Sequence, residues 1–184
     1  MWFMQQKTAL RWFTRVAFLG AAAAVLMVAI ETPILPAAPY LKWDPGDIPA
    51  MVAAFAMGPV AGAAVEVVKI VLWQLTGKNT TGPVGFAANL LAGLTLVVSA
   101  GLVYRSWRTR AGAIAAMAAG TLAMTAVMVL ANALVFFPLW GIKGPAVTKA
   151  LVEAAVPFNV LKGILTSTIT FVVYKKVRQY LDGR

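Results

Sequence analysis

Four polar side chains interrupt the apolar stretches of this 184-residue sequence in a way that could serve chemistry: Asn132, Asn159, Lys162 and Lys69. An Asn amide offers both a hydrogen-bond donor and an acceptor, whereas a Lys ammonium offers donors only. Asn159 and Lys162 are three residues apart, so they share one face of a helix. Two amides and one ammonium at similar depth, below an aromatic rim at residues 136–140, suit a flat heteroaromatic ligand with carbonyl and ring N–H groups. The alternative is that the amides only hydrogen-bond neighbouring helices.

Glu66 and Lys69 also lie three residues apart, and opposite charges at this spacing neutralise each other. A charge inside a membrane span costs at least about 2.5–3.5 kcal/mol on insertion scales, so each one needs an explanation. The pair is therefore either an internal ion pair or a ligand contact. Asp47 precedes Ile48 and Pro49, an order typical of a helix N-cap, so we expect Asp47 to cap a helix or to be solvated.

Several kinds of chemistry are excluded by residue types that the sequence lacks. The chain has no Cys and no His, which removes thiol nucleophiles, disulfides, Cys or His metal sites and His general bases. No pair of carboxylates has an obvious catalytic spacing, and the spacing of a nucleotide-binding P-loop is absent. We therefore expect no catalytic residues, no metal site and no cofactor.

The composition is typical of an integral membrane protein. Hydrophobic residues make up 61% of the chain and charged residues 12%. Soluble domains have about 45–50% apolar and about 25% charged residues, so this chain has too little charge to cover a water-facing surface. A soluble enzyme and a disordered chain are both excluded.

Six apolar segments must position the polar residues. They run over residues 16–34, 48–57, 60–75, 84–104, 111–139 and 151–174. A spanning helix needs about 20 apolar residues, which four of the segments provide. The second and third segments are short and meet at Gly58-Pro59, so we predict two helices joined by a tight turn; one kinked helix is the alternative. The prediction is an all-α membrane protein with six transmembrane helices in a single domain, residues 1–184.

The Lys and Arg residues concentrate on one predicted side of the membrane. The richer side carries ten of them: Lys7, Arg11, Arg15, Arg105, Arg108, Arg110, Lys175, Lys176, Arg178 and Arg184. The other side carries only Lys42, Lys78, Lys143 and Lys149. Because cytoplasmic loops are enriched in Lys and Arg, both termini are predicted to be cytoplasmic. This asymmetry accounts for the net charge of +10 without a nucleic-acid partner.

The N-terminal segment and the first long loop differ from the apolar segments in composition. Residues 1–14 combine aromatic and basic side chains, which predicts an amphipathic segment at the membrane interface; a cleavable signal peptide is the alternative. Residues 35–47 form a proline-rich outer loop that we expect to act as a stiff lid. Tyr40 and Trp43 in this loop are placed either to stack on a ligand ring or to anchor in the lipid headgroups.

The order of several motifs resembles a known family. The motifs are Leu-Lys-Trp-Asp-Pro-Gly-Asp-Ile-Pro-Ala at residues 41–50, Phe-Ala-Met-Gly-Pro-Val-Ala-Gly at 55–62, Gly-Pro at 82–83 with Ala-Asn-Leu-Leu-Ala-Gly at 88–93, Pro-Leu-Trp-Gly at 138–141 and Pro-Phe-Asn-Val-Leu-Lys-Gly at 157–163. In this order they are similar to the riboflavin-specific substrate-binding (S) component of energy-coupling factor (ECF) transporters. The position after Lys69 departs from the pattern, because Ile70 stands where many relatives carry an amide.

The resemblance implies a six-helix S-component fold that binds a flavin from outside, beneath the first outer loop. The expected ligand is riboflavin or FMN, carried as a transported molecule. The residues that the resemblance assigns to the ligand, together with the outer-loop side chains, are Asn132, Asn159, Lys162, Thr80, Thr81, Gly82, Tyr40, Leu41 and Trp43.

The resemblance also implies partners and a location. S components do not hydrolyse ATP; they dock on a transmembrane coupling (T) component and two ATP-binding subunits in the prokaryotic cell membrane. The small residues Ala17 and Ala21 on the first helix are the expected docking face. Two alternatives stay open: an S component for another vitamin, or a stand-alone proton-coupled transporter that uses Glu66, Lys69 and Glu153 as relay groups.

Overall fold

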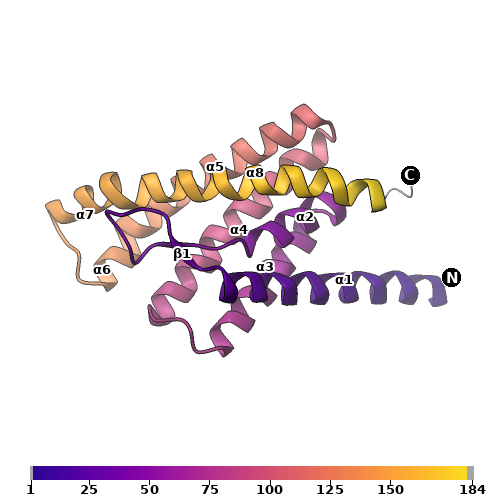
Figure 1. Ribbon diagram of the computed structural model, residues 1–184, viewed down its shortest axis with the longest axis horizontal. Helices are drawn as coiled ribbons and strands as arrows, with labels where there is room; N and C mark the ends of the chain where they lie inside the picture. Colours follow the sequence, from indigo (N-terminus) through magenta and orange to yellow (C-terminus); the bar gives the residue numbers. More distant parts are fainter. Residues whose placement is uncertain (1, 182–184) are drawn as a thin grey trace.

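The computed structural model describes the backbone of residues 2–181 and the side chains of residues 9–174 and 176. The chain folds into a bundle in which α1 and α8 run along the long axis and α4 and α5 cross it obliquely (Figure 1). The elements are α1 (Trp2–Ala29), β1 (Thr32–Pro33), β2 (Lys42–Trp43), α2 (Asp47–Met57), α3 (Pro59–Leu75), α4 (Gly82–Ser106), α5 (Arg110–Ala131), the π-helical η1 (Asn132–Phe136), α6 (Phe137–Leu139), α7 (Pro145–Ala150), the π-helical η2 (Leu151–Ala155) and α8 (Val156–Leu181).

The predicted six-helix membrane fold is confirmed. The six segments correspond to α1, α2, α3, α4, the run from α5 to α6 and the run from α7 to α8. Four of them are long and apolar enough to cross a membrane alone: residues 9–29, 82–106, 110–139 and 145–174. The last segment begins at Pro145, six residues before the predicted start, because proline after Gly144 is well placed in the first turn of a helix.

The turn between α2 and α3 confirms two separate helices. Gly58 ends α2 with φ +99°, a value that favours glycine, and Pro59 begins α3. The two helices then pack closely, because a Cβ on Gly62 would lie 2.9 Å from the carbonyl oxygen of Ala50.

Helix α1 packs on α3 through one small residue and exposes others. A Cβ on Gly20 would lie 2.4 Å from Cγ1 of Val68, so glycine sets the close approach of the two helices. Ala17 and Ala21 lie on a different face, which is exposed together with Phe18. The predicted docking residues are therefore accessible from outside the bundle.

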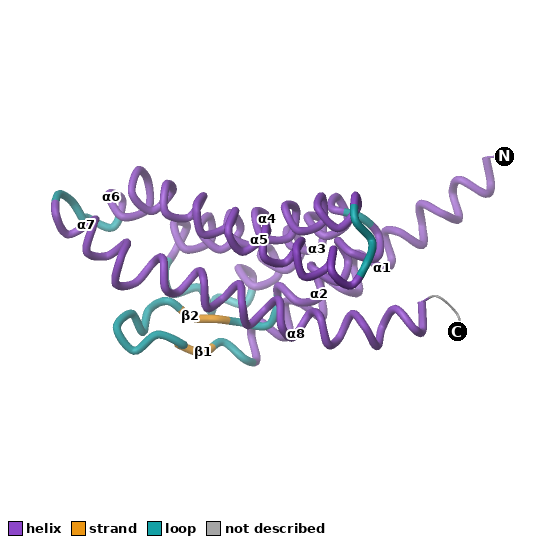
Figure 2. The backbone as a smooth tube through the Cα atoms, turned by 90° about the horizontal axis from the view of Figure 1, so that it is seen from above, coloured by secondary structure: helices purple, strands orange, loops and turns teal. Residues whose placement is uncertain are grey.

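The segment between α1 and α2, residues 30–46, is named the first outer loop here. Its strands β1 and β2 pair antiparallel, with Thr32 opposite Trp43 and Pro33 opposite Lys42. The sequence predicts only an extended, proline-rich loop in this place; the structure adds a short hairpin that runs along one side of the helices (Figure 2).

Both chain ends and the α4–α5 connection lie at the same end of the bundle (Figures 1 and 2). Of the ten cations predicted for that side, Lys7, Lys175, Arg178 and Arg184 lie outside the described side chains, as do the side chains of residues 1–8 in the predicted interfacial segment. Helix α1 is continuous from Trp2. The cytoplasmic placement of this end and the interfacial role of residues 1–14 stay predictions.

A cluster of aromatic side chains fills the bundle near this same end. The rings of Phe55 and Tyr104 stack with centroids 4.3 Å apart, and the ring of Tyr174 meets both edge-on. The hydroxyls of Tyr104 and Tyr174 lie 3.3 Å apart. The cluster joins α2, α4 and α8 and closes the interior at the end that carries the termini.

Candidate ligand-binding site

A cavity of about 280 Å³ lies at the other end of the bundle, between the first outer loop and helices α3, α4, α5 and α8. Seven of the nine residues predicted for the ligand line it: Tyr40, Leu41, Thr80, Thr81, Asn132, Asn159 and Lys162. Tyr40, Thr80 and Thr81 are exposed, whereas Asn132, Asn159 and Lys162 are buried. The loop residues therefore form the mouth of the cavity and the helix residues its interior.

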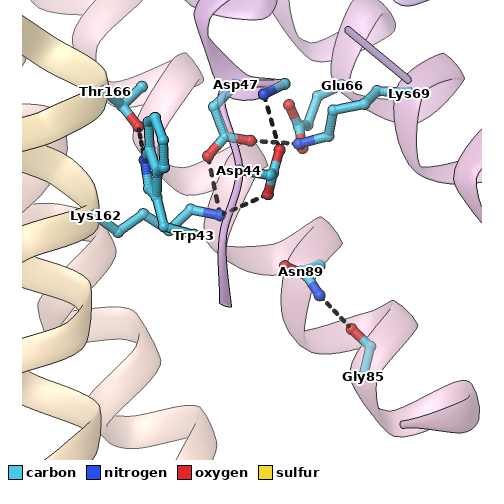
Figure 3. A network of polar contacts seen from close by, with 10 residues as sticks. Trp43, Asp44, Asp47, Glu66, Lys69, Gly85, Asn89, Lys162 and Thr166 are labelled. Atoms are coloured by element: carbon cyan, nitrogen blue, oxygen red, sulfur yellow. Dashed lines mark hydrogen bonds and ion pairs between the residues drawn. The ribbon is translucent and has the colours of Figure 1, made fainter. Parts of the chain in front are cut away.

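Trp43 and Gly82 are the two predicted residues that do not line the cavity. The indole N–H of Trp43 donates to Oγ1 of Thr166 at 3.2 Å, so the ring packs against α8 (Figure 3). Gly82 begins α4 with φ +64°, and its carbonyl accepts a hydrogen bond from Nδ2 of Asn79 at 2.7 Å. The predicted stacking of Trp43 over the ligand does not match this position: the tryptophan instead fastens the loop to the bundle.

The two buried amides have the same local arrangement. Nδ2 of Asn132 donates to the carbonyl of Met128 at 2.7 Å, and Nδ2 of Asn159 donates to the carbonyl of Ala155 at 2.8 Å. Each amide is thus held by its own helix and does not join two helices. Among the described residues, neither amide oxygen accepts a hydrogen bond, so both are free to accept one from a ligand in the cavity that the two residues line.

A π-helical segment adjoins each amide. η1 begins at Asn132, where the N–H of Phe137 donates to the Asn132 carbonyl, and η2 ends at Ala155, the residue whose carbonyl holds the Asn159 amide. A π turn inserts an extra residue into the helix and turns the side chains that follow, and such turns are frequent at functional sites. The aromatic side chains of Phe137, Trp140 and Phe158 follow these turns and line the cavity.

Five charged side chains form a buried cluster below the first outer loop: Asp44, Asp47, Glu66, Lys69 and Lys162 (Figure 3). Nζ of Lys162 lies 3.0 Å from Oδ2 of Asp47 and 3.7 Å from Oδ2 of Asp44. Nζ of Lys69 pairs with Asp47 and lies 2.5 Å from Oε1 of Glu66. Buried charges are tolerated only when paired, which this arrangement achieves for both lysines.

The cluster tests the expectations for the pair Glu66 and Lys69 and for Asp47. The ion pair predicted between Glu66 and Lys69 is present, within a larger network. Asp47 is the first residue of α2, but its carboxylate binds the two lysines inside the bundle, so the expectation of a solvated or capping Asp47 is wrong. Spacing along the chain could not reveal this, because the partners of Asp47 come from α3 and α8.

Lys162 belongs both to this cluster and to the cavity wall, whereas Lys69 is not among the lining residues. An ammonium has three N–H donors. The carboxylate of Asp47 at 3.0 Å is close enough to take one of them, and the carboxylate of Asp44 at 3.7 Å is beyond hydrogen-bond distance, so N–H donors remain for a ligand. Lys162 is thus a fixed cationic donor held in place by the loop and by α2.

Two further lysines stand at the mouth. Nζ of Lys42 lies 3.3 Å from Oε2 of Glu31, and Nζ of Lys78 donates to the carbonyl of Val28 at 3.1 Å. Both line the cavity together with Glu31. Their contacts tie the mouth to the end of α1.

Several lining residues escape prediction from the sequence. Trp73 lies in the wall, but an aromatic residue in an apolar helix gives no signal that separates a site from the core. Asn89 also lines the cavity, and it carries the same signal as Asn132 and Asn159, an amide inside an apolar span. Glu153, assigned to the alternative proton relay, is exposed in η2 and does not belong to the charge cluster.

Comparison with known proteins gives a consistent result. Residues 11–174 match the model of the ECF transporter, substrate-specific component family. The chain is 31% identical over 175 residues to the riboflavin transporter FmnP of Bacillus subtilis (strain 168), covering 91% of this chain and 92% of that protein. It is 34% identical over 173 residues to the riboflavin transporter RibU of Staphylococcus aureus (strain TCH60), covering 90% and 89%. A solved structure of the S component of a bacterial ECF transporter superposes with a TM-score of 0.80 at 34% identity, covering 96% of this chain and 99% of that one.

Proposed function

The chain belongs to the substrate-specific components of ECF transporters, and from this membership we propose that it captures riboflavin in the cavity described above. It would act as the membrane subunit that takes up the vitamin. The similar proteins named as riboflavin transporters support this ligand. The function is that of a transporter, so the expected mechanism is binding and gating without bond chemistry.

One observation carries the proposal: the buried residues Asn132 and Asn159, whose amide oxygens accept no hydrogen bond from the described residues, line the same cavity as the ammonium of Lys162. The edge of a flavin ring presents two carbonyls on either side of an N–H group. Its N–H would donate to an amide oxygen, and its carbonyls would accept from Lys162 and from the remaining amide N–H groups. The aromatic side chains of Phe137, Phe158 and Trp140 supply apolar surface for the ring.

Riboflavin is expected to bind the purified protein near one-to-one, with quenched flavin fluorescence. Asn132→Ala and Asn159→Ala should each weaken binding about tenfold or more, because each removes a partner of a desolvated ligand group. Fluorescence titration of the detergent-purified protein measures the stoichiometry and the affinity of riboflavin binding.

The matched control for this titration is Thr125→Val on α5. Its hydroxyl also bonds back to its own helix, at 2.8 Å to the Thr121 carbonyl, but does not line the cavity. Affinity should be unchanged in this control. Wild-type affinity in both Asn variants would remove the amides from the site.

Docking on the T component and the two ATP-binding subunits is proposed for the exposed face of α1 that carries Ala17 and Ala21. Small side chains permit close helix approach. We expect Ala17→Trp with Ala21→Trp to abolish co-purification with these partners while riboflavin affinity stays unchanged. Leu122→Trp is the control, since Leu122 on α5 is 69% exposed but lies on a different helix. Retained assembly in the double variant would contradict this docking face.

A further inference from the structure

Three arginines occupy the short connection between α4 and α5, at the end of the bundle where both chain termini lie (Figure 1). Arg105 lies in the last turn of α4, Arg108 lies between the helices, and Arg110 is the first residue of α5. All three residues are exposed. Among the described side chains, none of the three forms an ion pair with a carboxylate. The connection therefore holds three positive charges that the described part of the chain does not neutralise.

Hydrogen bonds and close packing fix the backbone of this connection. The N–H of Trp107 donates to the carbonyls of Val103 and Tyr104, and the N–H of Thr109 donates to the carbonyl of Trp107. The hydroxyl of Thr109 caps α5 by accepting a hydrogen bond from the N–H of Gly112 at 3.0 Å. A Cβ on Gly112 would lie 1.9 Å from the carbonyl oxygen of Trp107, so glycine is needed there. These contacts hold the three arginines close together at one turn.

The connection joins two segments that are each long and apolar enough to cross a membrane. These segments are residues 82–106 and 110–139, so only residues 107–109 separate them. The ends of such segments lie at the membrane–water interface, where tryptophan is enriched. Trp107 is 50% exposed and stands among the three arginines. We therefore expect the connection to lie at the depth of the lipid headgroups.

The type of cation indicates which group it binds. The connection carries only arginine, whereas every basic residue predicted for the opposite side of the membrane is a lysine. A guanidinium can donate two parallel hydrogen bonds to one phosphate, whereas an ammonium acts as a point charge. Clusters of basic residues at the end of a membrane span attract anionic lipids. We propose that Arg105, Arg108 and Arg110 bind the phosphate of an anionic phospholipid headgroup.

The test titrates the full-length protein in detergent with phosphatidylglycerol, and with zwitterionic phosphatidylcholine for comparison, and measures binding by native mass spectrometry. Arg108→Gln with Arg110→Gln should weaken phosphatidylglycerol binding about tenfold and change phosphatidylcholine binding less than about twofold. Arg108→Lys with Arg110→Lys should weaken phosphatidylglycerol binding about threefold, because it keeps the charges and removes the paired hydrogen bonds. Unfolding temperatures equal to that of the wild-type protein, measured without added lipid, show that the variants are folded.

The matched control is Lys143→Gln with Lys149→Gln, which removes two exposed cations beside and within α7, at the opposite end of the bundle (Figure 1). Its affinity for phosphatidylglycerol should equal that of the wild-type protein. Unchanged affinity in the glutamine variant of the arginines, an equal loss in the control, or full retention in the lysine variant would overturn the assignment. Loss of co-purification with the T component and the ATP-binding subunits, at unchanged phosphatidylglycerol affinity, would also overturn it and assign the arginines to a protein partner.

Discussion

Asp47→Ala is expected to cause the largest loss of stability of any single substitution in the buried charge cluster. The carboxylate of Asp47 contacts the ammoniums of both Lys69 and Lys162, and all three groups are buried. Removing one partner of a buried ion pair typically costs about 3–5 kcal/mol, because it leaves an uncompensated charge in a medium of low polarity. Thermal unfolding of the detergent-purified protein, followed by tryptophan fluorescence, measures the effect.

The control for this prediction is Glu31→Ala. It breaks the ion pair between Glu31 and Lys42, whose side chains are 21% and 37% exposed, respectively. Ion pairs that water reaches contribute only about 0–1 kcal/mol to the free energy of unfolding. The unfolding temperature of Glu31→Ala should therefore stay close to that of the wild-type protein. Equal shifts in the two variants would mean that water reaches the cluster and that the lysines do not depend on Asp47.

Lys162→Met is expected to cause the largest loss of riboflavin affinity, about 100-fold or more. The substitution keeps much of the side-chain volume but removes the cationic donor of the buried cavity wall, whereas Lys42 and Lys78 stand at the mouth. A hydrogen bond from a charged donor contributes about twice as much as a neutral one, and here the ligand acceptor would lose it in a water-poor site. Isothermal titration calorimetry gives the affinity.

Lys69→Met provides the matched comparison. It removes the other lysine of the same buried cluster, so both variants should lose stability. Lys69 does not line the cavity, so its variant should retain riboflavin affinity within a few-fold when measured below its unfolding temperature. If the two variants lose affinity to the same degree, the loss reflects the integrity of the cluster, and Lys162 has no direct contact with the ligand.

The helices could be predicted from the sequence because local signals mark their ends. Gly58-Pro59 and Gly82-Pro83 each precede or open a predicted helix, and four of the six apolar runs have the length that a bilayer requires. Gly144-Pro145 opens α7 in the same way, six residues before the predicted start. The π turns η1 and η2 and the β1–β2 hairpin could not be predicted. They depend on how neighbouring elements pack, which no local pattern records.

The candidate site also contains residues that could be predicted and contacts that could not. Asn132, Asn159 and Lys162 were predictable because a polar residue in an apolar span demands a partner. The carboxylates that hold Lys162 could not be predicted. Asp44 lies in the first outer loop and Asp47 in α2, and both meet Lys162 of α8 only in the folded chain. Trp43 is aromatic and could stack on a ligand, yet its indole N–H donates to the hydroxyl of Thr166. The sequence does not distinguish Thr166 from the other hydroxyl residues of α8.

The shared position of Lys162 has a thermodynamic consequence. Its ammonium forms an ion pair with Asp44 of the first outer loop and also lines the cavity. By linkage, a ligand that binds this ammonium favours the attached loop by the same free energy with which the attached loop favours the ligand. Weakening the Asp44 contact would therefore lower the affinity for the ligand, and a bound ligand would hold the loop on the bundle more firmly.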